Sequence, residues 1–231
     1  MSLQDSISDF DRVIKTLRGE NGCPWDREQT HESLRSCIME EAAELQAAIR
    51  IYEQTKDAGN MKEELGDLLL QVVMQSTIAE EEGLFTLEDV IIGVQEKMIR
   101  RHPHVFGDLN VNDSKEVLKN WEEIKKKEKE TQTWTSSPLK DIPKELPSLT
   151  RATKTLKKVD KLYEKAPSFL QTQKELIQSA NMLVNCVDHP EDAANEMGNL
   201  LMLLSRLAMQ MHLPIEQILN DRIDDLIDQY E

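Results

Sequence analysis

The chain has 231 residues, enough for one large or two small domains with a true hydrophobic core. It contains 43 acidic and 28 basic residues, and its formal net charge at pH 7 is -15. This charge argues against binding to a nucleic-acid polymer or to an anionic membrane surface. No apolar run approaches membrane-spanning length. We therefore expect neither a nucleic-acid nor a membrane partner.

The three cysteines, Cys23, Cys37 and Cys186, are too widely spaced for a disulfide framework or a zinc motif. Free thiols of this kind fit a reducing compartment. The first six residues, from Met1 to Ser6, have neither the basic start nor the apolar run of a secretory signal. A cytoplasmic location is therefore expected.

Helical periodicity recurs along the first half of the chain. Helices are predicted over residues 5–18, 34–52, 61–79, 86–101 and 114–130. Asn60 and Glu63 have the spacing of a capping box for the third helix, while Thr86 and Asp89 begin the fourth. Pro103 ends the fourth helix within a predicted loop. No stretch shows the period of two that marks a strand, so the predicted fold class is all-α.

Two pairs of acidic residues lie on the second and third predicted helices. Glu41 and Glu44 form the first pair, and Glu64 and Asp67 form the second. A spacing of three places both carboxylates of a pair on neighbouring turns of one helix face. Glu41 falls within the apolar stripe of its helix. The helix over 61–79 is apolar nearly all round, which predicts a central, buried helix.

These four carboxylates are predicted to converge on a metal ion. A short loop between the two helices makes an antiparallel pair, and a buried carboxylate is costly unless it is protonated, paired or metal-bound. Oxygen-only ligands suit Mg²⁺ and also permit Mn²⁺. The neighbouring Glu40 and Glu63 are assigned to the solvent-exposed faces. The alternative is an ordinary exposed acidic face in an acid-rich chain.

The second half of the chain carries a partial repeat of the acidic motif. Residues 131–148 contain three prolines and are interpreted as a linker, which separates a domain over 1–130 from one over 149–231. Glu196 and Asn199 lie where the first half has Glu64 and Asp67, and the segment around Glu175 supplies at most one acid. We therefore expect two tandem helical-bundle repeats, of which the second is degenerate and binds metal poorly.

Four sequence segments together resemble the MazG family. They are Gly22-Cys23-Pro24-Trp25-Asp26-Arg27-Glu28-Gln29-Thr30, Glu40-Glu41-x-x-Glu44, Glu64-x-x-Asp67 and Arg100-Arg101-His102-Pro103-His104-Val105-Phe106. The resemblance is dense over residues 10–130 and weak beyond. It implies an all-α nucleoside triphosphate pyrophosphohydrolase that converts NTP or dNTP to the monophosphate and pyrophosphate with Mg²⁺. A metal-carried nucleotide is compatible with the acidic chain, because the metal supplies positive charge.

The resemblance also implies roles for individual residues. Glu41, Glu44, Glu64 and Asp67 match the family's metal ligands, Lys97 and Arg101 its basic pair, and Trp121 and Lys125 its Trp-x-x-x-Lys element. Lys97 and Arg101 would bind the polyphosphate and stabilise the developing charge, with Trp121 and Lys125 as further substrate contacts. A metal-activated water would attack, with Glu41 or Glu44 orienting it or accepting its proton. From the residues alone, Lys97 and Arg101 also fit surface charges, and Trp121 fits a packing anchor.

Several alternatives stay open at this point. A di-iron bundle requires two Glu-x-x-His pairs, whereas the chain has only Glu28-x-x-His31. A non-catalytic nucleotide-sensing or scaffold module would explain the eroded second repeat. A dUTP-specific or phosphoribosyl-ATP-specific hydrolase belongs to the same superfamily. The resemblance further implies a homodimer, unless the two repeats of one chain pair with each other.

Overall fold

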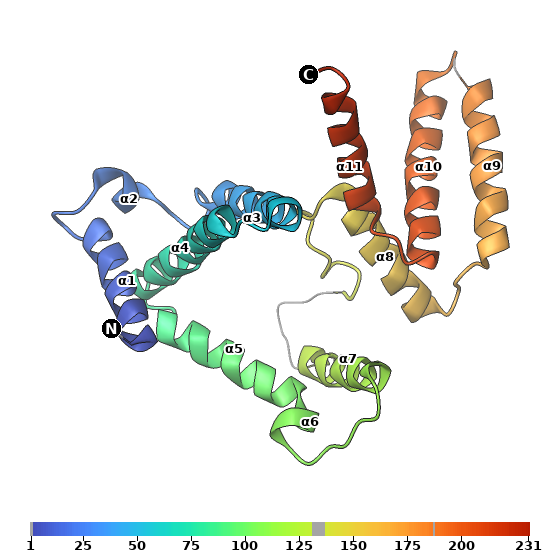
Figure 1. Ribbon diagram of the computed structural model, residues 1–231. Coiled ribbons are helices and arrows are strands. Elements are labelled where there is room, and N and C mark those ends of the chain that lie inside the picture. The colour runs from blue at the N-terminus through green and yellow to red at the C-terminus, as the bar shows by residue number, and fades with distance from the viewer. Residues whose placement is uncertain (1, 131–136, 187) are drawn as a thin grey trace. The chain divides into compact units, whose positions relative to one another are not determined.

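The computed structural model describes residues 2–130, 137–186 and 188–231, and all regular structure within these ranges is helical (Figure 1). The all-α prediction is confirmed. Within the described residues, no helix combines the length and the apolar character needed to cross a membrane. Residues 131–136 of the predicted linker lie outside the described ranges.

The helices form two compact units that divide after Lys127. The N-terminal unit contains α1 (Leu3–Arg18), α2 (Pro24–Glu28), α3 (Arg35–Thr55), α4 (Gly59–Glu81), α5 (Leu87–Arg101), α6 (Pro103–Phe106) and most of α7 (Ser114–Glu130). The C-terminal unit contains α8 (Ser148–Tyr163), α9 (Phe169–Asn185), α10 (Pro190–Gln210) and α11 (Ile215–Asp228).

The core of the N-terminal unit lies where α1 and α3 meet the second half of α4. Ile14 of α1 and Leu34 before α3 pack with Val73, Met74 and Ile78 of α4. The first half of α4 is different, because Leu65 and Leu69 are about half exposed there. The prediction that α4 is buried all round is therefore correct for its C-terminal half only.

Arg18 anchors α1 to the C-terminal end of α4. Its guanidinium donates to both carboxylate oxygens of Glu81, at 2.9 and 2.7 Å, and to the backbone carbonyls of Asp26 and Gln29. The turn before α2 is equally constrained at Gly22. A Cβ there would lie well inside van der Waals contact with backbone carbonyl oxygens of the preceding helix, so only glycine fits.

Helix starts follow local hydrogen bonding. Thr86 and Asp89, predicted to begin α5, form a capping box there. The capping box predicted at Asn60 is absent: α4 begins at Gly59, two residues before the predicted start, and the N–H of Gly59 donates to the Asp57 carboxylate at 2.9 Å. Residues 103–106, predicted as loop, form the short helix α6 because proline suits the first position of a helix.

The C-terminal unit is built around α10. This helix packs against α9 and α8, and α11 contacts α8 and α10. Arg206 of α10 donates to both oxygens of Asp160 on α8, at 2.9 Å each, in a largely buried ion pair. Each unit thus contains a pair of long contacting helices, α3 with α4 and α9 with α10 (Figure 1). The relation of these pairs as tandem repeats, and the roles of the two domains, stay predictions.

Candidate metal centre

The α3–α4 hairpin positions the first acidic group. Helix α3 ends at Thr55. The next residue, Lys56, adopts the left-handed conformation with φ 61°, and its N–H donates to the carbonyl of Tyr52 at 2.8 Å. The chain then turns into α4 within two residues. The two helices pack along each other, so acids near the middle of α3 face acids in the first half of α4.

Three of the four predicted ligands come together at this hairpin. Glu41, Glu64 and Asp67 each offer one carboxylate oxygen, and these three oxygens lie within 4.8 Å of one another. All three residues are half-buried. Glu44 is exposed and stands outside this group of three. The sequence thus indicated a converging set of acids, and the structure brings Glu41, Glu64 and Asp67 closest.

Burial, and then repulsion from neighbouring acids, raise the pKa values of Glu41 and Glu64. Burial raises the pKa of Glu41, and the charges of Asp67 and Glu44 raise it further. Burial likewise raises the pKa of Glu64, with Glu44 and Asp67 again adding to the effect. Glu44 is therefore within electrostatic reach of the group. The charges that raise both pKa values are acidic, so the cluster is destabilised unless a cation or a proton joins it.

The donor set fits a hard divalent cation. Its contacting atoms are carboxylate oxygens on two helices, which are the ligands that Mg²⁺ prefers. Thiolate and imidazole groups, which favour softer metals, are not among the three grouped residues. Gly66 lies between Glu64 and Asp67, and no atom lies within 4 Å of the position that a Cβ would occupy there. The packing of the described chain alone does not require glycine at that position.

Sequence reasoning missed Gln71, which supports Glu41. Gln71 lies on α4 one turn beyond Asp67 and is 8% exposed. Its Nε2 donates to Glu41 Oε1 at 3.5 Å, whereas its buried Oε1 has no partner among the described residues. The signal was available in the sequence: the spacing of four between Asp67 and Gln71 places both side chains on one face.

A second group of predicted site residues forms where α5 meets α7. The guanidinium of Arg101 lies 5.1 Å from the centre of the Trp121 ring, and Lys125 Nζ lies 4.8 Å from the same ring. Lys97 lies one turn before Arg101 on α5 and is half-buried. Cation–π attraction therefore holds two positive charges beside Trp121.

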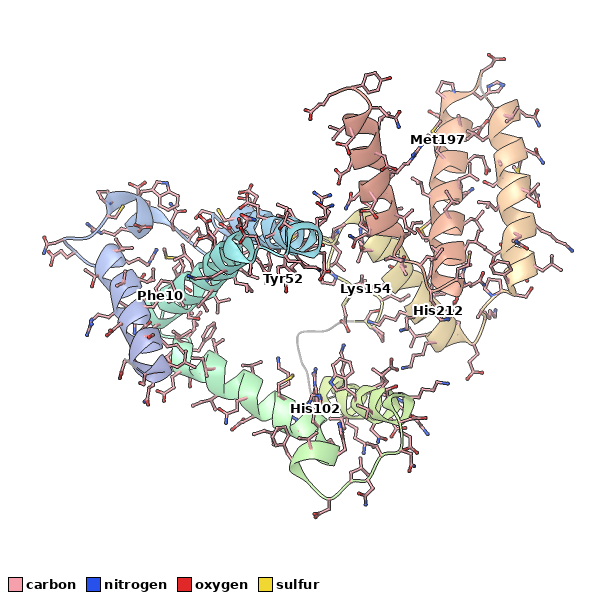
Figure 2. All side chains as sticks on the ribbon, viewed as in Figure 1. Phe10, Tyr52, His102, Lys154, Met197 and His212 are labelled. Atoms are coloured by element: carbon pink, nitrogen blue, oxygen red, sulfur yellow. The ribbon has the colours of Figure 1, made fainter. Side chains whose placement is uncertain are left out.

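The structure of one chain does not bring the acidic and the basic groups together. Helix α5 leads away from the α3–α4 hairpin, and His102 marks its far end in Figure 2. His102 itself has a structural contact, because its Nδ1 lies 2.6 Å from the carbonyl oxygen of Met98. Convergence of all eight predicted site residues within one chain is thus not observed.

Comparison with known proteins identifies the family. The MazG nucleotide pyrophosphohydrolase domain matches residues 29–106, a range that includes both acidic pairs, Lys97 and Arg101. A protein of Escherichia coli strain K12 named nucleoside triphosphate pyrophosphohydrolase is 36% identical over 214 residues, covering 86% of this chain and 76% of that protein. The chain belongs to the MazG family. The resemblance seen in the sequence motifs is confirmed, and membership places this MazG protein among hydrolases.

Two further relatives show how far the similarity extends. Thermotoga maritima has a protein named nucleoside triphosphate pyrophosphohydrolase/pyrophosphatase MazG, 35% identical over 229 residues, which cover 95% of this chain and 82% of that protein. An uncharacterised Bacillus subtilis protein, YabN, is 52% identical over 155 residues. That match covers 67% of the MazG chain described here but only 30% of YabN. The C-terminal unit is therefore included in the similarity to the Thermotoga relative.

Proposed function

We propose that this MazG protein is a Mg²⁺-dependent nucleoside triphosphate pyrophosphohydrolase. It would convert an NTP or dNTP to the monophosphate and pyrophosphate, with Mn²⁺ as a substitute ion. The observation that carries the proposal is the approach of three carboxylate oxygens, from Glu41, Glu64 and Asp67, to within 4.8 Å of one another. Family membership and the names of the Escherichia coli and Thermotoga relatives support the same activity.

The acidic residues divide into ligands and a candidate base. Glu41, Glu64 and Asp67 would hold the ion, which when bound supplies positive charge to the triphosphate and lowers the pKa of water. Glu44 also belongs to the predicted ligand set. Because it is exposed and adjacent, it is the better placed residue to orient the attacking water and accept its proton. Attack of water on the α- or β-phosphorus breaks the bridge between them and releases pyrophosphate.

The basic group would bind the phosphate chain. Lys97 and Arg101 provide two charges one turn apart, and Arg101 can donate two parallel hydrogen bonds to phosphate oxygens. Trp121 is already in contact with Arg101 and Lys125. These contacts favour a role in which the indole positions both cations for binding phosphate. They make a role in stacking on the base less favoured.

We further propose that the active form is a homodimer. Leu65 and Leu69 of α4 are 51% and 48% exposed, and α5 exposes Ile92 and Val94. Exposed apolar side chains on α4 and on α5 are groups that association with a second copy would remove from water. A second copy could also supply the basic group that a single chain holds away from its own acids.

The decisive experiment is pyrophosphate release by the purified chain with Mg²⁺ and a panel of NTPs, dNTPs and modified nucleotides. Glu64→Ala should abolish release, because it removes a ligand from the cluster. Glu63→Ala is the matched control: it removes the same side chain from the neighbouring, exposed position and should leave turnover within about twofold. Wild-type turnover in Glu64→Ala, or no release from any nucleotide by the wild type, would refute the proposal and favour a non-catalytic module.

A further inference from the structure

Helix α8 concentrates basic residues in a chain that is strongly acidic overall. The helix contains five basic residues and one acidic residue, whereas the formal net charge of the whole chain is -15. At roughly 100° per residue, the five basic residues fall within a sector of about 120° that runs about 15 Å along the helix. We call this surface the basic face of α8. It consists of Arg151, Lys154, Lys157, Lys158 and Lys161.

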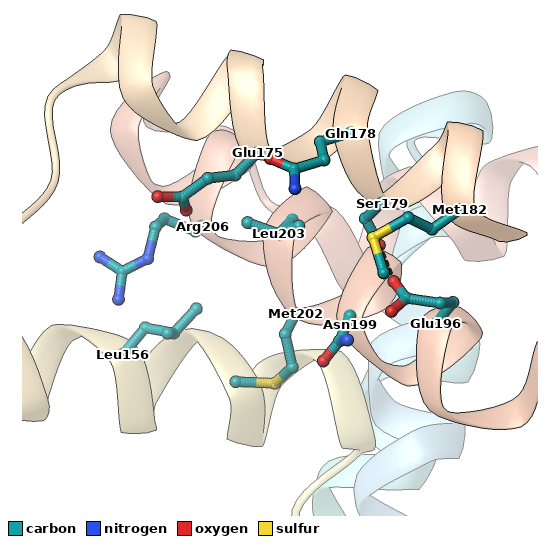
Figure 3. Close-up of a pocket in the computed structure, with 10 residues that line it drawn as sticks. All are labelled: Leu156, Glu175, Gln178, Ser179, Met182, Glu196, Asn199, Met202, Leu203 and Arg206. Carbon is teal, nitrogen blue, oxygen red and sulfur yellow. Dashed lines mark hydrogen bonds between the residues drawn. The ribbon is translucent and has the colours of Figure 1, made fainter. Parts of the chain in front are cut away.

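The basic face lies opposite the side of α8 that packs within the C-terminal unit. Leu156 is buried and lines the cavity that α8 forms with α9 and α10 (Figure 3). Asp160, the acidic residue of α8, also lies on the packed side, where both of its carboxylate oxygens accept hydrogen bonds from Arg206 of α10. The charge of Asp160 is therefore neutralised by α10 and does not offset the basic face.

The side chains of Arg151, Lys154 and Lys157 are exposed and follow one another at a spacing of three. Within the part of the chain that the structure describes, these three side chains form no ion pair. Like charges at this spacing on a helix repel one another. An anionic partner that contacts the basic face would relieve this repulsion, so the face favours a partner of opposite charge.

An acidic segment of the same chain already contacts one edge of the basic face. In the segment before α8, a carboxylate oxygen of Asp141 lies 3.7 Å from Lys158 Nζ. The side chain of Asp141 is only 10% exposed, and the adjacent Ile142 is buried. The segment thus combines an ion pair to α8 with burial of an aliphatic neighbour. Leu162, one turn beyond Lys158, is 46% exposed and offers an apolar contact at the border of the same face.

We propose that the basic face of α8 is a docking surface for a segment of a partner protein in which acidic residues stand beside aliphatic ones, as in Asp141-Ile142. A short segment of this kind pairs with the exposed cations and buries aliphatic side chains against Leu162. A nucleic-acid polymer or an anionic lipid surface fits less well. Its dense, extended charge would also approach the acidic remainder of the chain.

The test measures the fluorescence anisotropy of a short fluorescein-labelled peptide that repeats Asp-Ile-Glu-Leu, titrated with the full chain. The peptide should bind, and its affinity should fall as salt is added, because salt screens exposed charges. Lys154→Glu/Lys157→Glu should weaken binding at least about tenfold, because two attractions become repulsions. Lys154→Gln/Lys157→Gln should have an intermediate affinity. Lys115→Glu/Lys119→Glu, at exposed positions of α7, changes the net charge equally and should bind the peptide like the wild type.

Three further probes identify the chemistry that is recognised. A peptide that repeats Asn-Ile-Gln-Leu should bind at least about tenfold more weakly, because it lacks the charges. Oligouridine RNA, and phosphatidylcholine vesicles containing phosphatidylglycerol, should also bind more weakly than the acidic peptide. The proposal is overturned if the wild type does not bind the acidic peptide, if RNA or vesicles bind more tightly, or if Lys154→Glu/Lys157→Glu keeps wild-type affinity. Equal affinities for the acidic and the neutral peptide would overturn it as well.

Glu64→Ala separates this surface from the proposed hydrolase centre. The variant should bind the acidic peptide with wild-type affinity even though it releases no pyrophosphate, because the basic face belongs to the C-terminal unit. Either proposal can therefore fail without the other.

Discussion

At the scale of single residues, the acidic cluster depends on a neighbour that is itself neutral. Gln71 is buried beside Glu41 and donates to its carboxylate over a long 3.5 Å contact. The amide opposes the other influences on Glu41, because its hydrogen bond favours the charged form and lowers the pKa. We infer that Gln71 orients Glu41 for metal binding, as groups behind a ligand commonly do.

Replacing Gln71 by leucine should therefore weaken Mg²⁺ binding roughly tenfold. The free energy of unfolding should change by no more than about 1 kcal/mol, because leucine tolerates burial at this position and the unpartnered Oε1 is lost with the amide. Isothermal titration with Mg²⁺, beside chemical denaturation, measures both quantities. Gln75→Leu, one turn further along α4, is the control. Equal Mg²⁺ affinities in the wild type and Gln71→Leu would show that Gln71 does not orient a ligand.

At the scale of elements, the start of α5 illustrates a helix whose first turn is stabilised by side chains. Thr86 accepts a hydrogen bond from the N–H of Asp89 at 3.2 Å, and Asp89 accepts one from the N–H of Thr86 at 2.9 Å. The bond from the backbone of Thr86, followed by the bond from its hydroxyl, lowers the pKa of Asp89. The capping box therefore acts most strongly when Asp89 is ionised.

Thr86→Ala should lower the free energy of unfolding by about 1 kcal/mol at neutral pH. The pH dependence follows from the lowered pKa of Asp89: its contribution is present above the ordinary aspartate value of 3.8 and is lost as pH falls through the lower folded value. The difference between wild type and Asp89→Asn should shrink over that acidic window in thermal melts. Thr16→Ala, within α1, should stay within about 0.5 kcal/mol of wild type. A constant difference across the acid range would contradict this account.

Elements with a strong local signal could be predicted, whereas features set by distant contacts could not. The period of 3.6 in the apolar residues was sufficient to place α3, α4 and α5. The short loop between α3 and α4 was sufficient to predict the antiparallel pair that brings Glu41 to Glu64 and Asp67. The predicted start of α4 was wrong because the Asp57 carboxylate accepts a hydrogen bond from the N–H of Gly59, so the helix begins before Asn60. The exposure of Leu69 was missed because sequence periodicity does not reveal which apolar face lacks a neighbour in the same chain.

At the scale of the whole molecule, the separation of acids and bases within the N-terminal unit supports the proposal that the active form is a homodimer. Leu69→Glu would place a charge on the exposed apolar face of α4, where burial against a second copy would be costly. Sedimentation velocity should show the dimer dissociation constant raised by at least about tenfold, with pyrophosphate release falling in parallel. Leu3→Glu, at another exposed leucine, should change neither.

A wild-type protein that is monomeric at all concentrations, yet fully active, would contradict the dimer proposal. It would also require the basic group of α5 and α7 to reach the acids of its own chain by a movement of α5. Activity that falls on dilution, and returns on concentration, supports the dimer without any substitution.

The glycines of the N-terminal unit predict an uneven tolerance to random mutagenesis. At Gly22 the backbone carbonyls of the preceding helix exclude every larger residue, so functional clones selected from a saturated library should keep glycine there. At Gly66 the described chain leaves room for a methyl group, and alanine would favour the helix. Recovery of Gly66→Ala among active clones would therefore show that only the packing of the fold decides which residues this position tolerates. Its depletion would reveal that a substrate or a second chain approaches the backbone between Glu64 and Asp67.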